Sequence, residues 1–155
     1  MTLAWLKTKI PPPVYALLAA GLMWLVHQDV PIGQLIPTAY RPLAWVFVVL
    51  GLSLDLTSLA LFFTRRTTPN PINPANAREL VISGMYRFTR NPMDVGLLLL
   101  LIAWAIWLGS VSAVLVIPMF MWVLTQIQIK PEERALAQKF GDDYQHYLKQ
   151  VRRWI

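Results

Sequence analysis

A polar strip at residues 80–96 combines residue types that could bind a charged ligand. It reads LVISGMYRFTRNPMDVG and carries two guanidinium groups, those of Arg87 and Arg90, shortly before a long uncharged run. Asn91 is a favourable N-cap residue and Pro92 a favourable first helical residue, so a helix is predicted to begin here. The free N–H groups of a helix start, together with two guanidinium groups, can bind an anion such as a carboxylate.

The same residues also permit a purely structural interpretation. Asn91, Pro92 and Asp94 are together typical of a capped helix start, which requires no ligand. Arginines beside a membrane helix commonly mark its cytoplasmic end and can contact lipid phosphate. Spacing alone therefore leaves both a ligand site and a lipid anchor open.

A second group of chemically capable residues lies near the C-terminus. Glu132 and Glu133 follow a proline, where a C-terminal helix is predicted to begin, and acids in a first turn also stabilise the helix dipole. Further on, an apolar stripe at helical spacing includes Tyr144 and Tyr147 and is interrupted at Gly141. We expect this stripe to pack on the membrane-facing side, with the two tyrosines available to line a site.

Asp55 is exceptional because it lies in the middle of an apolar run. An ionised carboxylate at that depth costs about 2.5–3.5 kcal/mol on insertion scales, so its side chain should face protein or water. Gly51, Asp55 and Ser58 recur at i, i+4 and i+7, which predicts close packing against another helix. Asp55 is therefore either a packing residue that is protonated or hydrogen-bonded, or a group in the inner wall of an active site.

Composition indicates a small integral membrane protein with a single domain over residues 1–155. The chain is 56% hydrophobic and only 14% charged. The lack of cysteine excludes disulfides and thiolate chemistry, and two histidines, His27 and His146, are too few and too far apart to predict a metal centre. The net charge of +6 could suit nucleic acid, but the basic residues flank apolar segments, so we interpret them as topology signals and expect no nucleic-acid partner.

Four apolar segments can span a bilayer, at about residues 13–28, 42–63, 92–109 and 111–129. The very short link between the last two predicts a tight helical hairpin, which would bring the strip and the glutamate pair to the same membrane face. C-terminal cytosolic helices are expected at 131–153. The prediction is an all-α polytopic membrane protein with four transmembrane helices and a C-terminal amphipathic helical segment.

Charge asymmetry predicts the orientation. Every basic residue except Arg41 lies on the side that carries the strip and the glutamate pair. With an even number of spans, both termini should then be cytosolic, in the cytoplasmic membrane if the chain is bacterial. The segment at 67–76, rich in proline and asparagine, is predicted to be an irregular crossover on that side.

The two polar groups resemble the signature of the isoprenylcysteine carboxyl methyltransferases and phospholipid methyltransferases, a pattern close to LVxxGxYxxxRNPxYxG followed by a Glu-Glu pair and an FGxxYxxY run. In the strip the resemblance is carried by Leu80, Val81, Gly84, Tyr86, Arg90, Asn91, Pro92 and Gly96. In the second block it is carried by Glu132, Glu133, Leu136, Phe140, Gly141, Tyr144 and Tyr147. Asp94 stands where the family usually has a tyrosine, so any role of that ring is in doubt here.

The resemblance implies a membrane methyltransferase that uses S-adenosylmethionine. It implies that the cofactor is bound by the matching residues of the strip, by both glutamates and by Tyr144 and Tyr147, with Arg90 suited to the cofactor's carboxylate. The acceptor would be a carboxylate or an amine of a lipophilic, membrane-embedded molecule. A protonated amine must first lose a proton, and the candidate catalytic bases are Asp55 and Glu133.

Two other functions are consistent with the sequence. Sterol reductases resemble this C-terminal architecture and use a nicotinamide cofactor, although they are usually much longer. A small transporter or scaffold could instead use the arginines only to hold lipid headgroups. Binding of a sulfonium cofactor, of a nicotinamide or of neither would separate the three.

Overall fold

The computed structural model of the chain describes residues 10–30, 33–64 and 80–155. The described residues form helices, with one isolated β-bridge between Gln34 and Ser110. The crossover predicted at 67–76 lies outside them. Prediction of an all-helical chain is therefore confirmed for the part that the structure describes.

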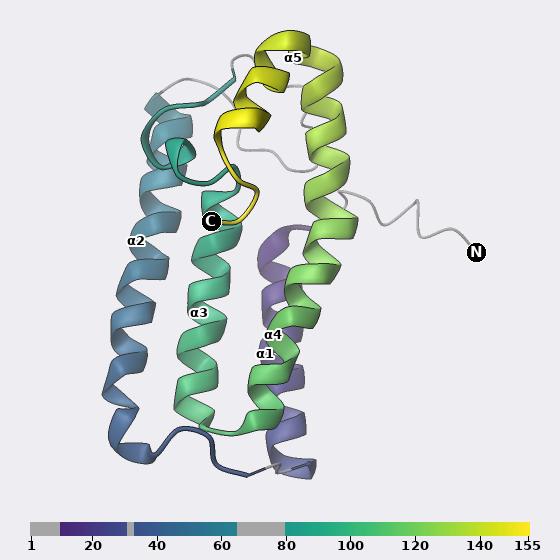
Figure 1. Cartoon of the computed structure of the whole chain (residues 1–155). Coiled ribbons are helices and arrows are strands. Elements are labelled where there is room, and N and C mark those ends of the chain that lie inside the picture. The colour runs from purple at the N-terminus through teal and green to yellow at the C-terminus, as the bar shows by residue number, and fades with distance from the viewer. Residues whose placement is uncertain (1–9, 31–32, 65–79) are drawn as a thin grey trace, which may run out of the picture.

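The structure has five α-helices in its described residues; the first four run side by side, and the last lies at one end of the bundle (Figure 1). The five helices are α1 (Pro12–Asp29), α2 (Pro42–Thr64), α3 (Pro92–Leu108), α4 (Val111–Leu124) and α5 (Lys130–Gln150). Short 3₁₀ turns at Thr38–Tyr40 and Gly84–Arg87 precede α2 and α3. Proline begins α1, α2 and α3, because its fixed φ suits the first helical position and its missing N–H has no partner there anyway.

Two helical stretches are long and apolar enough to cross a bilayer, namely Thr38–Leu61 and Val111–Gln150. The apolar helix α3 is shorter, at 17 residues. Large apolar side chains remain exposed on the outside of α1, α2 and α4, among them Leu17, Trp45, Leu56 and Trp122. Such a surface suits a lipid surrounding, and the crossing of a membrane by all four helices stays a prediction.

The sequence predicts a new helix start at the glutamate pair, and this prediction is wrong, because the helix continues from α4. A π-helical turn, Thr125–Ile129, joins α4 directly to α5. The N–H of Lys130 donates to the carbonyl of Thr125, five residues earlier, and this wider turn accommodates the missing N–H of Pro131. Glu132 and Glu133 therefore do not face a free helix start, and stabilisation of a helix dipole does not explain them.

Small residues bring α2 and α3 into close contact. A Cβ added to Gly51 would lie 2.8 Å from the backbone oxygen of Gly96, and a Cβ added to Gly96 would overlap the carboxylate of Asp55. Ser58, one turn further along α2, is fully buried. The predicted packing stripe is thus confirmed, and Gly96 lies on the face of α3 that contacts α2.

At the end of the bundle away from the strip, the tight hairpin has the predicted form. Gly109 ends α3 in the left-handed conformation (φ +75°). Its carbonyl accepts hydrogen bonds from the N–H groups of Leu35 (2.8 Å) and Ile36 (3.1 Å). Arg41 donates to the carbonyl of Trp107 (3.1 Å) and lies 5.6 Å from the centre of its ring, so this cation stabilises the end of α3.

Candidate functional site

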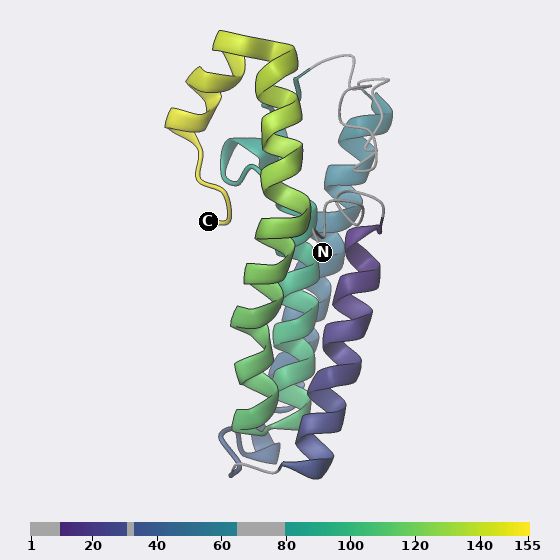
Figure 2. The same ribbon diagram turned by 90° about the vertical axis from the view of Figure 1, so that its right-hand side faces the viewer.

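Beyond the π-helical turn, α5 returns to the strip because its backbone is interrupted at Gly141. This residue has φ +52°, which glycine adopts without strain, and the second half of α5 folds back from it (Figure 2). The hydroxyl of Tyr147 then donates to the carbonyl of Tyr86 at 2.7 Å. The buried rings of Tyr144 and Tyr147 lie 6.1 Å apart. The two blocks of the sequence signature meet at one end of the bundle, as the hairpin predicted.

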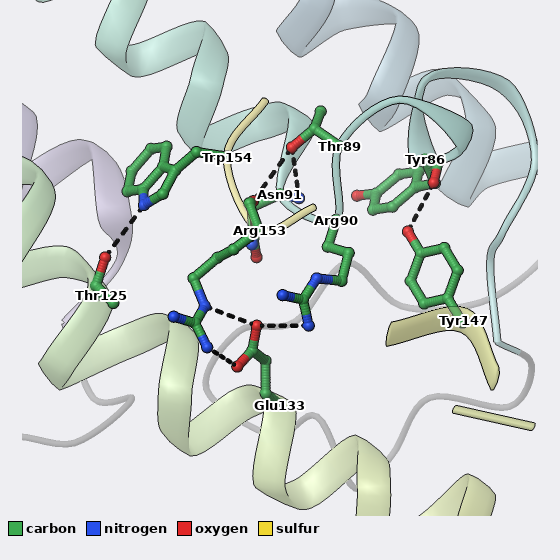
Figure 3. Close-up of polar contacts among 9 residues, drawn as sticks. All are labelled: Tyr86, Thr89, Arg90, Asn91, Thr125, Glu133, Tyr147, Arg153 and Trp154. Carbon is green, nitrogen blue, oxygen red and sulfur yellow. Dashed lines mark hydrogen bonds and ion pairs between the residues drawn. The ribbon is translucent and has the colours of Figure 1, made fainter. Parts of the chain in front are cut away.

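The centre of this region is a carboxylate between two guanidinium groups (Figure 3). Arg90 Nη1 lies 3.1 Å from Glu133 Oε1, and Arg153 contacts both oxygens of Glu133, with Nε at 2.9 Å and Nη2 at 2.7 Å. The Arg90 and Glu133 side chains are only 13% and 14% exposed, against 33% for Arg153. Arg90–Glu133 is therefore a shielded pair, in which charge-assisted hydrogen bonds are strong.

Arg153 belongs to a C-terminal tail, residues 151–155, that folds back onto the strip. The N–H of Arg90 donates to the carbonyl of Arg152 (3.0 Å), and the carbonyl of Arg153 accepts from Thr89 Oγ1 (3.2 Å) and Asn91 Nδ2 (2.9 Å). Trp154 Nε1 donates to Thr125 Oγ1 at 3.2 Å. Its ring packs against the core formed by α1, α3 and α4.

The sequence does not predict that this tail lies against the strip. In the sequence Arg152 and Arg153 belong to the basic residues that indicate topology, and Trp154 by itself does not predict a return to the strip. The available signal was the Arg-Arg-Trp run directly after an apolar helical stripe. After a packed helix, such a run can bring a positive charge back to the protein surface, where the aromatic side chain anchors it by packing on the core.

The predicted caps of α3 are not formed as expected. Asn91 makes no side-chain capping bond, and its Nδ2 donates instead to the Arg153 carbonyl in the tail. The N–H of Asn91, which a capping box would direct to Asp94, donates instead to Thr89 Oγ1 at 3.2 Å. Asp94 is buried in the first turn of α3.

Tyr86 lies within electrostatic reach of two acidic residues, Glu132 and Asp94. Burial raises the pKa of the Tyr86 hydroxyl, and the carboxylates of Glu132 and Asp94 raise it further. The phenol therefore stays protonated at neutral pH and can donate a hydrogen bond. Asp55 lies next to Gly96 across the α2–α3 contact, and its Oδ1 is buried with no hydrogen-bond partner among the described residues.

The other predicted residues take more peripheral positions. Leu80 and Val81 begin the described part of the strip and are half-buried. Gly84 has φ +61° and lies against Leu61 of α2. Pro92 is buried at the start of α3. These residues support the strip, while Arg90, Glu133 and the tyrosines form the polar centre.

A cleft with a volume of about 390 Å³ opens between the strip and the second half of α5. Its walls include Arg87, Asp143, His146 and Tyr147. The volume is within the range of small-molecule sites. Tyr147 lines this cleft and also donates its hydroxyl hydrogen bond to Tyr86 in the strip.

Comparisons with known proteins agree with the two-block signature. The sequence pattern of a family described as phospholipid methyltransferase matches residues 41–143. An uncharacterized protein of Haemophilus influenzae is 48% identical over 63 residues, which are 41% of this chain and the whole of that protein. Protein-S-isoprenylcysteine O-methyltransferase of Schizosaccharomyces pombe is 32% identical over 72 residues, 46% of this chain and 30% of that protein. No solved structure matches the chain significantly.

Proposed function

The chain belongs to the phospholipid methyltransferase family, and from this we propose that it transfers a methyl group from S-adenosylmethionine to a carboxylate or amine of a lipophilic acceptor. The observation that carries the proposal is the shielded meeting of Arg90 with Glu133, one residue from each signature block. The ion pair of Arg90 and Glu133 does not cap a helix end, so helix capping does not explain why the two residues meet. A shared ligand site provides one.

The residues present fit this cofactor. Arg90 Nε is buried and has no hydrogen-bond partner within the described part of the chain, so a donor is available for a carboxylate. Glu132 can accept from an ammonium or a ribose diol, and the rings of Tyr86 and Tyr144 can contact a sulfonium. When bound, S-adenosylmethionine supplies an activated methyl group. We also propose that the remaining signature residues of the strip, Leu80, Val81, Gly84, Asn91, Pro92 and Gly96, contribute to the cofactor site through the backbone that they shape.

Catalysis would depend mainly on positioning. Transfer between two aligned atoms needs them about 3–3.5 Å apart in a site that excludes water. Arg90 and Glu133 are both held by hydrogen bonds to the tail and can fix one end of a ligand. Tyr144 and Tyr147 close this region from the α5 side.

A base is needed only if the acceptor is a protonated amine. Of the two candidates, Glu133 already contacts two guanidinium groups, so most of its acceptor positions are occupied. Asp55 has a buried oxygen without a partner among the described residues. We therefore assign the role of base to Asp55 in that case, and assign Glu133 to binding.

A lipophilic acceptor could enter from the bilayer, because the bundle exposes apolar side chains along α1, α2 and α4. The cofactor would enter from the side of the strip. The proposed partners are thus a lipophilic small molecule or lipidated substrate and the surrounding membrane lipids.

Calorimetric titration of the detergent-purified protein tests the proposal. S-adenosylhomocysteine should bind with a stoichiometry near one, whereas a reduced nicotinamide dinucleotide should not bind. Absence of S-adenosylhomocysteine binding by the folded protein would overturn the proposed function. Binding of the nicotinamide alone would favour the reductase alternative.

We further propose that the protein is a multi-pass membrane protein with both ends cytosolic. In the described residues Arg41 is the basic residue at the end of the bundle opposite the strip, where it is tied to Trp107. Reporter fusions after Ile155 and within 67–76 should report a cytoplasmic position, and a fusion near Pro37 an external one. An external reporter after Ile155 would contradict the four-span arrangement.

A further inference from the structure

We propose that the C-terminal tail is part of the cofactor site, and that Arg153 is a positioning residue that holds the Glu133 carboxylate beside Arg90. This inference rests on the proposed function. It concerns residues 152–154, which lie beyond the family match at 41–143. Three observations support it.

The first is the geometry of the ion pair. Arg153 contacts Glu133 through a planar fork, Nε to Oε1 and Nη2 to Oε2, which fixes the plane of the carboxylate. Arg90 adds a third contact at Oε1. A carboxylate can accept about four hydrogen bonds, so one acceptor position remains for a donor of the ligand.

The second is the charge balance between the two arginines. If Arg153 were absent, Glu133 would have Arg90 as its cationic partner, and a two-point contact with Arg90 would become favourable. The Nε donor of Arg90, which has no partner among the described residues, would then be drawn to Glu133. Arg153 therefore leaves Arg90 available for an anionic group of a ligand.

The third is the way in which the tail is anchored. The backbone carbonyls of Arg152 and Arg153 accept hydrogen bonds from the strip, and the indole of Trp154 is bound to Thr125 and packed on the core. These contacts place the Arg153 side chain without help from a ligand. A group that is held in advance costs less to order when the ligand binds.

The inference is tested by calorimetric titration of purified full-length variants with S-adenosylhomocysteine. Arg153→Ala should weaken binding about tenfold. Arg153→Lys should recover part of the loss, because lysine keeps the charge but cannot form the two-point contact. Lys149→Ala is the matched control, since it removes an exposed positive charge four residues before Arg153 without touching the ion pair; this variant should bind as the wild type does.

A double-mutant comparison separates positioning from a general structural role. If Arg153 acts through Glu133, then Arg153→Ala should cause no further loss of affinity in a Glu133→Ala background. An equal loss in both backgrounds would overturn the positioning role. Wild-type affinity in Arg153→Ala would overturn the inference and leave the proposed function intact, whereas a wild type that does not bind would overturn both. If Arg153→Ala does not fold, Arg153→Gln is measured by the same criteria.

Discussion

Glu133→Ala is expected to weaken S-adenosylhomocysteine binding by about 1.5–3 kcal/mol, the range for hydrogen bonds to charged groups. Glu133 is the carboxylate that joins Arg90 of the strip to Arg153 of the tail. Its removal leaves two guanidinium groups next to each other, so the site loses an acceptor and both arginines lose their fixed positions. Arg90→Ala should cause a loss of similar size, because it removes the donor proposed for the cofactor's carboxylate.

The measurement is calorimetric titration of folded variants, with Lys149→Ala as a control. Lys149 is exposed on the last turn of α5, so its replacement changes the net charge of the same region without touching the ion pair. Its affinity should be that of the wild type. If Arg90→Ala and Glu133→Ala both bind normally, the two signature blocks do not share a ligand site.

Gly96→Ala is expected to lower the free energy of unfolding by about 1–3 kcal/mol, the usual cost of overpacking a well-packed core. A Cβ at this position would overlap the carboxylate of Asp55, so either that side chain or the α2–α3 contact must shift. The loss should appear although alanine is a better helix former than glycine by about 1 kcal/mol. Thermal or denaturant unfolding in detergent measures it.

Two further glycines make this prediction specific. Gly21 of α1 has no neighbour within 4 Å of an added Cβ, so Gly21→Ala should be neutral or stabilising. Gly51→Ala would press on the backbone oxygen of Gly96 and should also destabilise. Adding Asp55→Ala should relieve Gly96→Ala, because the obstacle is a side chain, but not Gly51→Ala. Equal stability of Gly96→Ala and Gly21→Ala would contradict the assigned packing role.

The helices could be predicted from the sequence because local features determine them. Proline at Pro12, Pro42 and Pro92 begins three of them, and apolar runs determine their lengths. Gly109, in the left-handed conformation, ends α3 and forces the hairpin that brings the two blocks together. These features predict that Arg90 and Glu133 lie at the same end of the bundle. They do not predict that the two side chains form an ion pair.

The tail and the caps could not be predicted, because contacts between residues distant in sequence decide them. Asn91 has the side chain of a good cap, yet its Nδ2 donates to the Arg153 carbonyl, 62 residues away, and this bond turns the amide toward the tail. Thr89 then takes the N–H that Asp94 was expected to bind. Local propensity describes what each residue can do, and the fold selects among these options.

The π-helical turn at Thr125–Ile129 also determines in which direction around the helix axis the side chains of α5 point. An α-helix advances about 100° per residue, and a π-helical turn holds roughly one residue more than an α-helical turn. Without that additional residue, Glu133 would be presented about 100° away around the helix axis from Arg90. The insertion or deletion of one residue at 125–129 would therefore redirect both glutamates without changing either of them, so the register of the chain, as much as the identity of its side chains, specifies this site.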